Sequence, residues 1–177
     1  ILFTGYEALT LLMIIAMAIG ALIIMQLGPL LESFGQNKLL YEILVMGVTR
    51  ELSCVLTAFI IVARSGTAIS TELGNMKVQK EIELIDSIGI SPISYLVVPR
   101  MVGVTAACVV LSIYFNVAAF LGGWWVASFF RVIPFSEFSY MLLRSLSIED
   151  IIQCLLKSLI FGIIISLISA YHGFKVE

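Results

Sequence analysis

The chain contains 177 residues, of which 60% are hydrophobic and 12% are charged, and its formal net charge is −2. A mean hydropathy of +1.10 excludes a soluble domain of this length and predicts an integral membrane protein. The sequence has no basic stripe and no zinc-ligand spacing, so we expect no nucleic-acid partner, no metal ion and no cofactor. Cys54, Cys108 and Cys154 each lie inside an apolar run without CxxC spacing, and we interpret them as packing residues.

The first predicted membrane span covers residues 8–31, which include no charged side chain. At about 1.5 Å per helical residue, this stretch crosses a hydrocarbon core about 30 Å thick. A signal peptide is the competing interpretation, but the basic n-region and the small-residue cleavage site that it needs are missing. A short polar connection from Glu32 to Glu42 then leads to the second predicted span, residues 43–63, which ends at Arg64.

The third predicted span is the uncharged stretch of residues 101–130, long enough to tilt or to continue past the membrane. Its small residues offer faces on which helices approach closely. These residues are Gly103, Ala106, Ala107, Ala118, Ala119, Gly122 and Gly123. Trp124 and Trp125 follow, where the aromatic residues of a membrane interface are expected.

A second polar connection, residues 131–150, precedes the fourth predicted span, residues 151–171. Ser147 is the expected N-cap of the last helix, because Glu149 and Asp150 then fall in the first turn. Carboxylates in that position interact favourably with the helix dipole. The sequence therefore predicts an all-α, polytopic membrane protein with four spans, organised as one domain over residues 1–177.

Residues 65–100 form a long polar stretch between the second and third spans. Within it, apolar residues recur at steps of three and four, which predicts a short amphipathic helix. The apolar face consists of Val78, Ile82, Ile85 and Ile88. Gly89 is the expected C-cap and Pro92 stops the helix, while Gly74 and Asn75 are expected to form a turn in front of it.

The polar face of this predicted helix carries charges of both signs, Lys77, Lys80, Glu81, Glu83 and Asp86. A helix that only binds anionic lipid headgroups would carry mainly Lys and Arg. Mixed charge favours a protein partner, and a surface helix lying at the headgroups is the alternative.

The run from Gly66 to Arg100 resembles the central signature of the MlaE-type permeases, the membrane subunits of MCE-associated ABC lipid transporters. The motifs that carry the resemblance are Glu72-Leu73-Gly74, Met76-Lys77-Val78, Tyr95-Leu96-Val97 and Pro99-Arg100, with Ile82, Gly89 and Pro92 between them. Weaker similarities lie at Arg50-Glu51-Leu52 and from Lys157 to Gly173.

The resemblance implies that the amphipathic helix is a coupling helix that docks on a cytoplasmic ABC ATPase. The coupling residues are then Glu72, Lys77, Lys80, Glu81, Ile82, Ile85 and Asp86. Glu72 either braces the coupling helix or only solvates the end of the second span. The resemblance also implies a permease homodimer, an extracytoplasmic MCE-domain partner and a fifth span, so this chain is expected to be truncated at both ends.

The predicted orientation follows from the Lys and Arg residues outside the spans. Arg64, Lys77, Lys80, Arg100 and Lys175 lie on the side of the central stretch, and Lys38, Arg131 and Arg144 lie on the other. The bias predicts a cytoplasmic coupling segment at residues 65–100 and an extracytoplasmic segment at 131–150. We expect the bacterial inner membrane or an organelle inner envelope membrane.

Arg50, Glu51 and Lys157 are charged residues well inside predicted spans, where each costs about 3 kcal/mol unless it is paired or hydrated. Counting from the span starts places all three about 9–12 Å below the same membrane boundary, so Glu51 and Lys157 are expected to pair. One interpretation is that the three residues line a hydrated cavity that receives a lipid phosphate. The alternatives are a purely structural salt bridge, or a Lys157 side chain that reaches the interface while Arg50 pairs with Glu51. The resemblance favours the lipid cavity.

One departure from the family pattern concerns the second span. The family usually has Glu-Leu-Gly-Pro where this chain has Glu51-Leu52-Ser53-Cys54. Without the Gly-Pro pair, we expect a straighter second span.

The sequence contains no Gly-x-x-x-x-Gly-Lys-Ser/Thr loop, so ATP hydrolysis is expected on a separate subunit. We interpret the chain as a permease subunit, not an enzyme, that moves phospholipid between the inner membrane and an MCE protein. A membrane scaffold without transport is one alternative. An intramembrane serine hydrolase using Ser65 and His172 is another, although Ser65 lies outside a Gly-x-Ser-x-Gly elbow.

Overall fold

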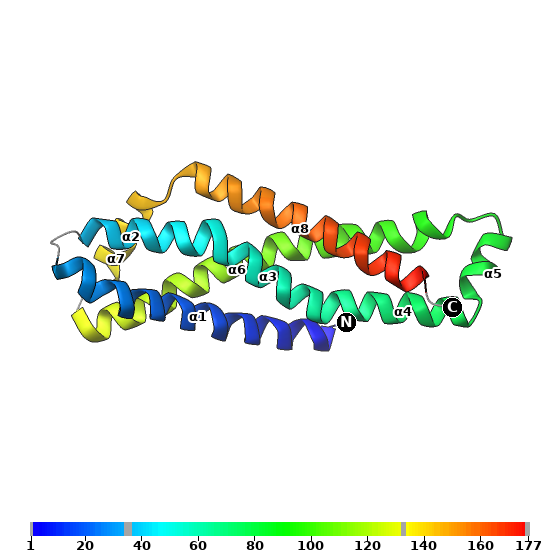
Figure 1. Ribbon diagram of the computed structural model, residues 1–177, viewed down its shortest axis with the longest axis horizontal. Helices are drawn as coiled ribbons and strands as arrows, with labels where there is room; N and C mark the ends of the chain where they lie inside the picture. The colour runs from blue at the N-terminus through cyan, green and yellow to red at the C-terminus, as the bar shows by residue number, and fades with distance from the viewer. Residues whose placement is uncertain (1, 34–36, 132–133, 176–177) are drawn as a thin grey trace. The chain divides into compact units, whose positions relative to one another are not determined.

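The computed structural model describes residues 2–33, 37–131 and 134–175, and within these ranges it contains helices and no strands. Figure 1 labels the elements. In chain order they are α1 (Leu2–Ser33), α2 (Asn37–Val45), η1 (Met46–Leu52), α3 (Ser53–Ile61), η2 (Val62–Gly66), α4 (Thr67–Val78), α5 (Glu81–Ser87), η3 (Ile93–Val97), α6 (Val98–Arg131), α7 (Phe135–Ser145) and α8 (Ile148–Phe174).

Among the described residues, four helices are long and apolar enough to cross a membrane: Leu9–Leu31, Leu39–Val78, Ile93–Phe129 and Ile148–Phe174. This result confirms the predicted all-α polytopic class and the prediction of four spans. The middle of the predicted connection from Glu32 to Glu42, residues 34–36, lies outside the described residues.

The second helix is much longer than predicted. It continues to Val78, and its 40 residues span roughly 60 Å, about twice the thickness of the hydrocarbon core. The predicted turn at Gly74 and Asn75 is therefore wrong: both residues lie inside α4, where Gly74 is buried. The turn comes instead at Lys80, whose φ of 60° is left-handed. The third helix likewise begins at Ile93, before the predicted residue 101.

Two π-helical segments, η1 and η2, interrupt the second helix. In η1 the Ser53 N–H donates to the Val48 carbonyl, five residues back, and the Ser53 hydroxyl donates to the Thr49 carbonyl at 3.0 Å. In η2 the Thr67 hydroxyl donates to the Ala63 carbonyl at 2.8 Å. Hydroxyls beside a widened turn satisfy carbonyls that water cannot reach inside a membrane. The second helix thus contains two widened turns, which were not predicted from the sequence.

The described chain divides into two compact units, and the first consists of residues 1–57 and 111–156. In this unit the backbones of α1 and α6 approach each other closely at two glycines, one on each helix. A Cβ on Gly20 would lie 1.8 Å from the Ala119 carbonyl oxygen, and a Cβ on Gly122 would lie 2.3 Å from the Met17 carbonyl oxygen. The predicted small-residue face around Gly122 is therefore a helix contact, which only glycine at these positions permits. Gly103, in contrast, faces open space.

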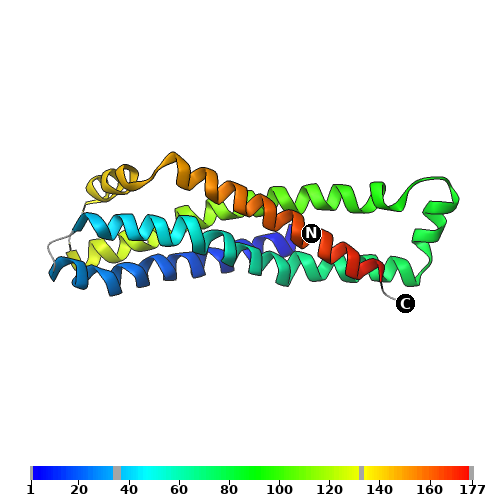
Figure 2. The same ribbon diagram turned by 45° about the horizontal axis from the view of Figure 1, so that its top comes forward.

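Helix α7 packs on α2 in the same unit. The rings of Tyr41 and Phe138 meet edge to face, with 5.6 Å between their centroids. Phe138 and Leu142 are buried, while Tyr140 and Leu143, on another side of α7, are exposed. Because α7 lies between α6 and α8 in the chain, this packing fixes the loop that starts α8 against α2 (Figure 2).

The second unit consists of residues 58–110 and 157–177. Its core cluster contains Leu73 of α4, Ile82 of α5, Leu96 of η3 and Ala170 of α8. Helix α5 runs across the ends of α4 and of the third span (Figures 1 and 2). Gly173 permits the close approach of α8 to α4, since a Cβ there would lie 2.6 Å from the Leu73 Cβ.

Candidate functional site

The start of α8 is held by a capping box. The Ser147 hydroxyl accepts a hydrogen bond from the Glu149 N–H at 3.3 Å, and Asp150 Oδ2 accepts one from the Ser147 N–H at 3.0 Å. Each side chain thus satisfies a backbone donor that the first helical turn leaves unpaired. The predicted N-cap role of Ser147 is confirmed.

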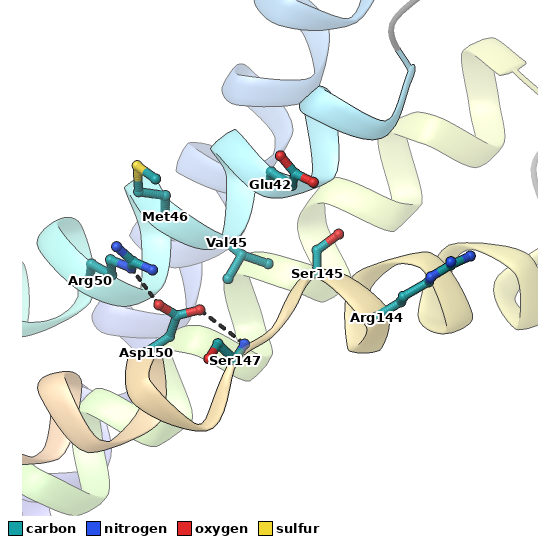
Figure 3. A pocket seen from close by; sticks show the side chains of 8 residues that line it. All are labelled: Glu42, Val45, Met46, Arg50, Arg144, Ser145, Ser147 and Asp150. Carbon is teal, nitrogen blue, oxygen red and sulfur yellow. Dashed lines mark hydrogen bonds and ion pairs between the residues drawn. The ribbon is translucent and has the colours of Figure 1, made fainter.

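Asp150 also pairs with an arginine from the second span. Its Oδ1 accepts a hydrogen bond from Arg50 Nε, and Figure 3 shows the carboxylate between the guanidinium and the Ser147 nitrogen. The Asp150 side chain is 3% exposed, whereas that of Arg50 is 32% exposed. Because the carboxylate is buried, its two partners are needed to offset the loss of water. Asp150 therefore links the widened turn η1 to the first turn of α8.

A pocket with a volume of about 280 Å³ lies next to this ion pair. Its lining contains two basic and two acidic side chains together with small polar and apolar ones: Glu42, Val45, Met46, Arg50, Arg144, Ser145, Ser147 and Asp150. In Figure 3 the Arg144 guanidinium points away from Asp150. Sites that enclose a whole drug-sized ligand have volumes of about 300–1,000 Å³, so this pocket has room for a polar headgroup but not for acyl chains.

The predicted lipid-cavity residues are distributed over both units. Arg50 and Glu51 lie on η1 in the first unit, where Glu51 is exposed. Lys157 is half-buried on α8 in the second unit. The ion pair between Glu51 and Lys157 stays a prediction.

Sequence reasoning missed the pairing of Asp150 with Arg50. It assigned Asp150 only to the helix dipole and placed it outside the fourth span, whereas α8 begins at Ile148. The available signal was an acidic residue three positions after an N-cap serine. Residues 100 apart in the chain pair only through the fold, so no local pattern connects them.

The predicted coupling helix corresponds to α5, which is shorter than expected and begins after the turn at Lys80. Ile82 is buried and Ile85 is partly buried against the core cluster of the second unit. The predicted apolar face is wrong at its ends, because Val78 belongs to α4 and both Val78 and Ile88 are exposed. Lys80, Glu81 and Asp86 face solvent, while Lys77 is half-buried.

The end of α5 confirms the predicted cap. Gly89 has φ +82°, its N–H donates to the Asp86 carbonyl at 2.9 Å, and the Ile90 N–H donates to the Ile85 carbonyl at 3.3 Å. These two bonds form a Schellman motif, which needs a left-handed residue that glycine adopts without strain.

Glu72 braces a different pair of helices from the one predicted. Its Oε1 lies 2.8 Å from the Arg100 Nη2, so the ion pair joins α4 to the start of α6 rather than to α5. Most of the Glu72 side chain is exposed, and such pairs contribute about 0.2–1 kcal/mol. The pair therefore orients the two helices more than it stabilises them.

The alternative interpretation as a hydrolase requires a Ser65–His172 dyad. Within the part of the chain that the structure describes, no hydrogen bond joins Ser65, on η2, to His172, near the end of α8. The His172 ring instead stacks edge to face on its neighbour Tyr171, with 5.8 Å between the centroids.

Comparisons with known proteins give one consistent result. The model of the family described as Permease MlaE matches residues 1–177. Probable ABC transporter permease proteins of Rickettsia typhi, a Synechocystis strain and Porphyra purpurea are 30%, 31% and 32% identical to the chain. These alignments cover 98%, 96% and 96% of the chain, and 67%, 64% and 64% of the respective relatives. The chain thus spans about two thirds of the length of the relatives that it matches.

Proposed function

The chain belongs to the MlaE permease family, and from this premise we propose that it is the membrane subunit of an ABC system that transports phospholipid. The lipid moves between the membrane that holds the chain and an extracytoplasmic MCE-domain protein. A separate ABC ATPase supplies the energy, and two copies of the permease form the transport unit. The membrane is the bacterial inner membrane or an organelle inner envelope membrane.

One observation carries the lipid part of this proposal. Arg50 is held by a buried carboxylate at the edge of a pocket large enough for a headgroup. A guanidinium that is fixed in orientation recognises a phosphate through two parallel hydrogen bonds. Acyl chains need no pocket of their own, because the apolar faces of the spans provide a surface for them.

The ATPase part rests on α5. This helix is anchored by Ile82 and Ile85, and it exposes acidic side chains and the apolar side chain of Leu84. The exposed Lys80 precedes the helix and the exposed Ile88 follows it, so the surface around α5 carries charges of both signs. Such a surface suits a protein better than anionic lipid, because it is not predominantly basic. The helix is held between α4 and the third span, so a force applied to it reaches both spans.

Photocrosslinking in cells tests the two parts separately. A photoreactive residue at the exposed Gln79 is expected to capture the ATPase, and one at Met46, which lines the pocket, is expected to capture phospholipid. Val117, exposed on α6, is the control for the surrounding bilayer lipid. Phospholipid capture at Met46 no greater than at Val117 would remove the lipid part. Failure to capture an ATPase at Gln79 would remove the coupling part.

A further inference from the structure

Two of the three cysteines meet inside the first unit. The Sγ atoms of Cys54, on α3, and Cys154, on α8, lie 3.5 Å apart, and both residues are buried. A disulfide requires about 2.05 Å between its sulfur atoms, so the two thiols need to approach by only about 1.5 Å to form one. The sequence interpretation of these residues as mere packing is thus incomplete.

The two sulfur atoms have different surroundings. The Cys154 sulfur accepts a hydrogen bond from Asn116 Nδ2 at 3.6 Å. The Ser53 hydroxyl, which donates its proton to the Thr49 carbonyl, also lies 3.4 Å from this sulfur. The single proton of the Cys54 thiol is shared between the Cys154 sulfur, at 3.5 Å, and the Cys154 carbonyl oxygen, at 3.3 Å. Donors that point at a sulfur stabilise its thiolate, which is the reactive form. The arrangement makes Cys154 the attacking thiol and Cys54 its neighbour.

An unused hydrogen-bond acceptor lies beside this pair, and a second lies on the same helix as Cys54. Asn116 Oδ1 and Thr57 Oγ1 are buried and have no hydrogen-bond partner among the described residues. Asn116 contacts Cys154 directly, and Thr57 lies one helical turn after Ser53. A buried acceptor without a donor favours a small molecule that carries an O–H group.

We propose that Cys154 and Cys54 form a thiol pair that reacts with hydroperoxides. The Cys154 thiolate attacks the nearer peroxide oxygen, the O–O bond breaks, and the leaving oxygen departs as water or alcohol with the thiol proton. Cys54 then attacks the resulting sulfenic acid, the S–S bond forms, and water leaves. In sum, two thiols and one hydroperoxide give one disulfide, one water and one alcohol or second water.

The disulfide joins positions 100 residues apart and ties the second span to the fourth, close to the pair of Arg50 with Asp150. Cys54 and Cys154 are residues of this chain, and the proposed reaction is inferred for this chain alone. It is independent of the transported substrate.

The test treats membranes that contain the full chain with cumene hydroperoxide, followed by denaturation and labelling of free thiols. The untreated chain presents three thiols, and we expect one after treatment, with a linked peptide containing Cys54 and Cys154 and recovery of three thiols on reduction. Cys108→Ser is the matched control and is expected to lose two thiols, leaving none.

Variants separate the two roles. Cys54→Ser, with Cys54→Ala as a second version, is expected to accumulate a sulfenic acid on Cys154 that dimedone traps. Cys154→Ser is expected to give no adduct on Cys54. Three free thiols in the treated chain would overturn the proposal, as would a link that includes Cys108. Dimedone on Cys54 instead of Cys154 would overturn the assignment of roles.

Discussion

At the scale of single residues, the Asp150 carboxylate makes two interactions, of which a local sequence pattern predicts only the first. One carboxylate oxygen closes the capping box with Ser147, and the other holds Arg50. The two interactions are coupled because the carboxylate is buried and needs both donors. Glu149, in contrast, is an exposed acid in the first turn, where a carboxylate interacts favourably with the helix dipole.

Asp150→Asn keeps the shape of the side chain but removes its charge. Breaking a buried ion pair costs about 3–5 kcal/mol, and the exposure of Arg50 to solvent reduces this to about 2 kcal/mol. We expect that loss in the free energy of unfolding in detergent micelles, measured by denaturant titration. Glu149→Gln is the control, with an expected loss of about 0.3–1 kcal/mol. Equal losses in the two variants would show that Asp150 acts only through the dipole.

Gly122 and Gly103 provide a matched pair on one helix. A Cβ on Gly122 would overlap the Met17 backbone, whereas a Cβ on Gly103 meets nothing within 4 Å. We expect Gly122→Ala to destabilise the protein by about 1–3 kcal/mol, because backbone must move. Gly103→Ala is expected to be neutral or to stabilise by up to about 1 kcal/mol through helix propensity. Thermal unfolding in micelles compares the two, and a stable Gly122→Ala would contradict the close packing of α1 on α6.

At the scale of elements, α5 is too short to be stable as an isolated helix, so its position depends on tertiary contacts. Two features supply them: the burial of Ile82 in the core cluster and the Schellman motif at Gly89. The rest of its surface remains available for a partner.

Ile82→Ala and Leu84→Ala separate anchoring from docking. Ile82 is 6% exposed and Leu84 is 63% exposed. Loss of a buried isoleucine side chain costs about 2–5 kcal/mol, so Ile82→Ala is expected to accelerate tryptic cleavage after Lys77 and Lys80. Leu84→Ala is expected to leave cleavage unchanged and, on the proposed function, to weaken ATPase binding. Unchanged cleavage in Ile82→Ala would mean that α5 does not depend on this contact.

Sequence and structure agree where the chemistry is local. Hydropathy identified four spans, and the caps at Ser147 and Gly89 were predicted from two or three neighbouring residues. Helix ends were missed, because a run of apolar residues marks the membrane boundary and not the last hydrogen bond of a helix. The polar residues from 65 to 78 continue the second helix and pack against α8 through Leu73 and Gly173.

The contacts of the candidate sites escaped prediction for a related reason. Arg50 with Asp150 and Cys54 with Cys154 are both separated by 100 residues. Their meeting depends on the packing of the second span against the start of the fourth, which composition and periodicity do not encode. The small residues of α6 predicted close packing but not which of them are used, since Gly122 is in contact and Gly103 is not.

At the scale of the whole molecule, transport distinguishes a permease from a scaffold. We expect Glu51→Ala and Lys157→Ala, made singly, each to slow lipid transfer to MCE protein by about tenfold, equivalent to about 1.4 kcal/mol of lost interaction. Transfer from labelled proteoliposomes that contain the complete complex measures this rate. If both variants transfer lipid at the normal rate and deletion of α5 prevents assembly of the complex, the alternative of a membrane scaffold without transport is favoured.

The two widened turns of the second helix have a further consequence for motion. A π-helical turn accommodates one residue more than the regular helix, and it disappears when that residue is taken up by the neighbouring turn. Such a shift in η1 would rotate the helix beyond it by about 100° and move it by about 1.5 Å along its axis. The second span would then transmit a twist, which spin labels at Leu39 and Thr71 would report as a change in relative orientation with little change in distance.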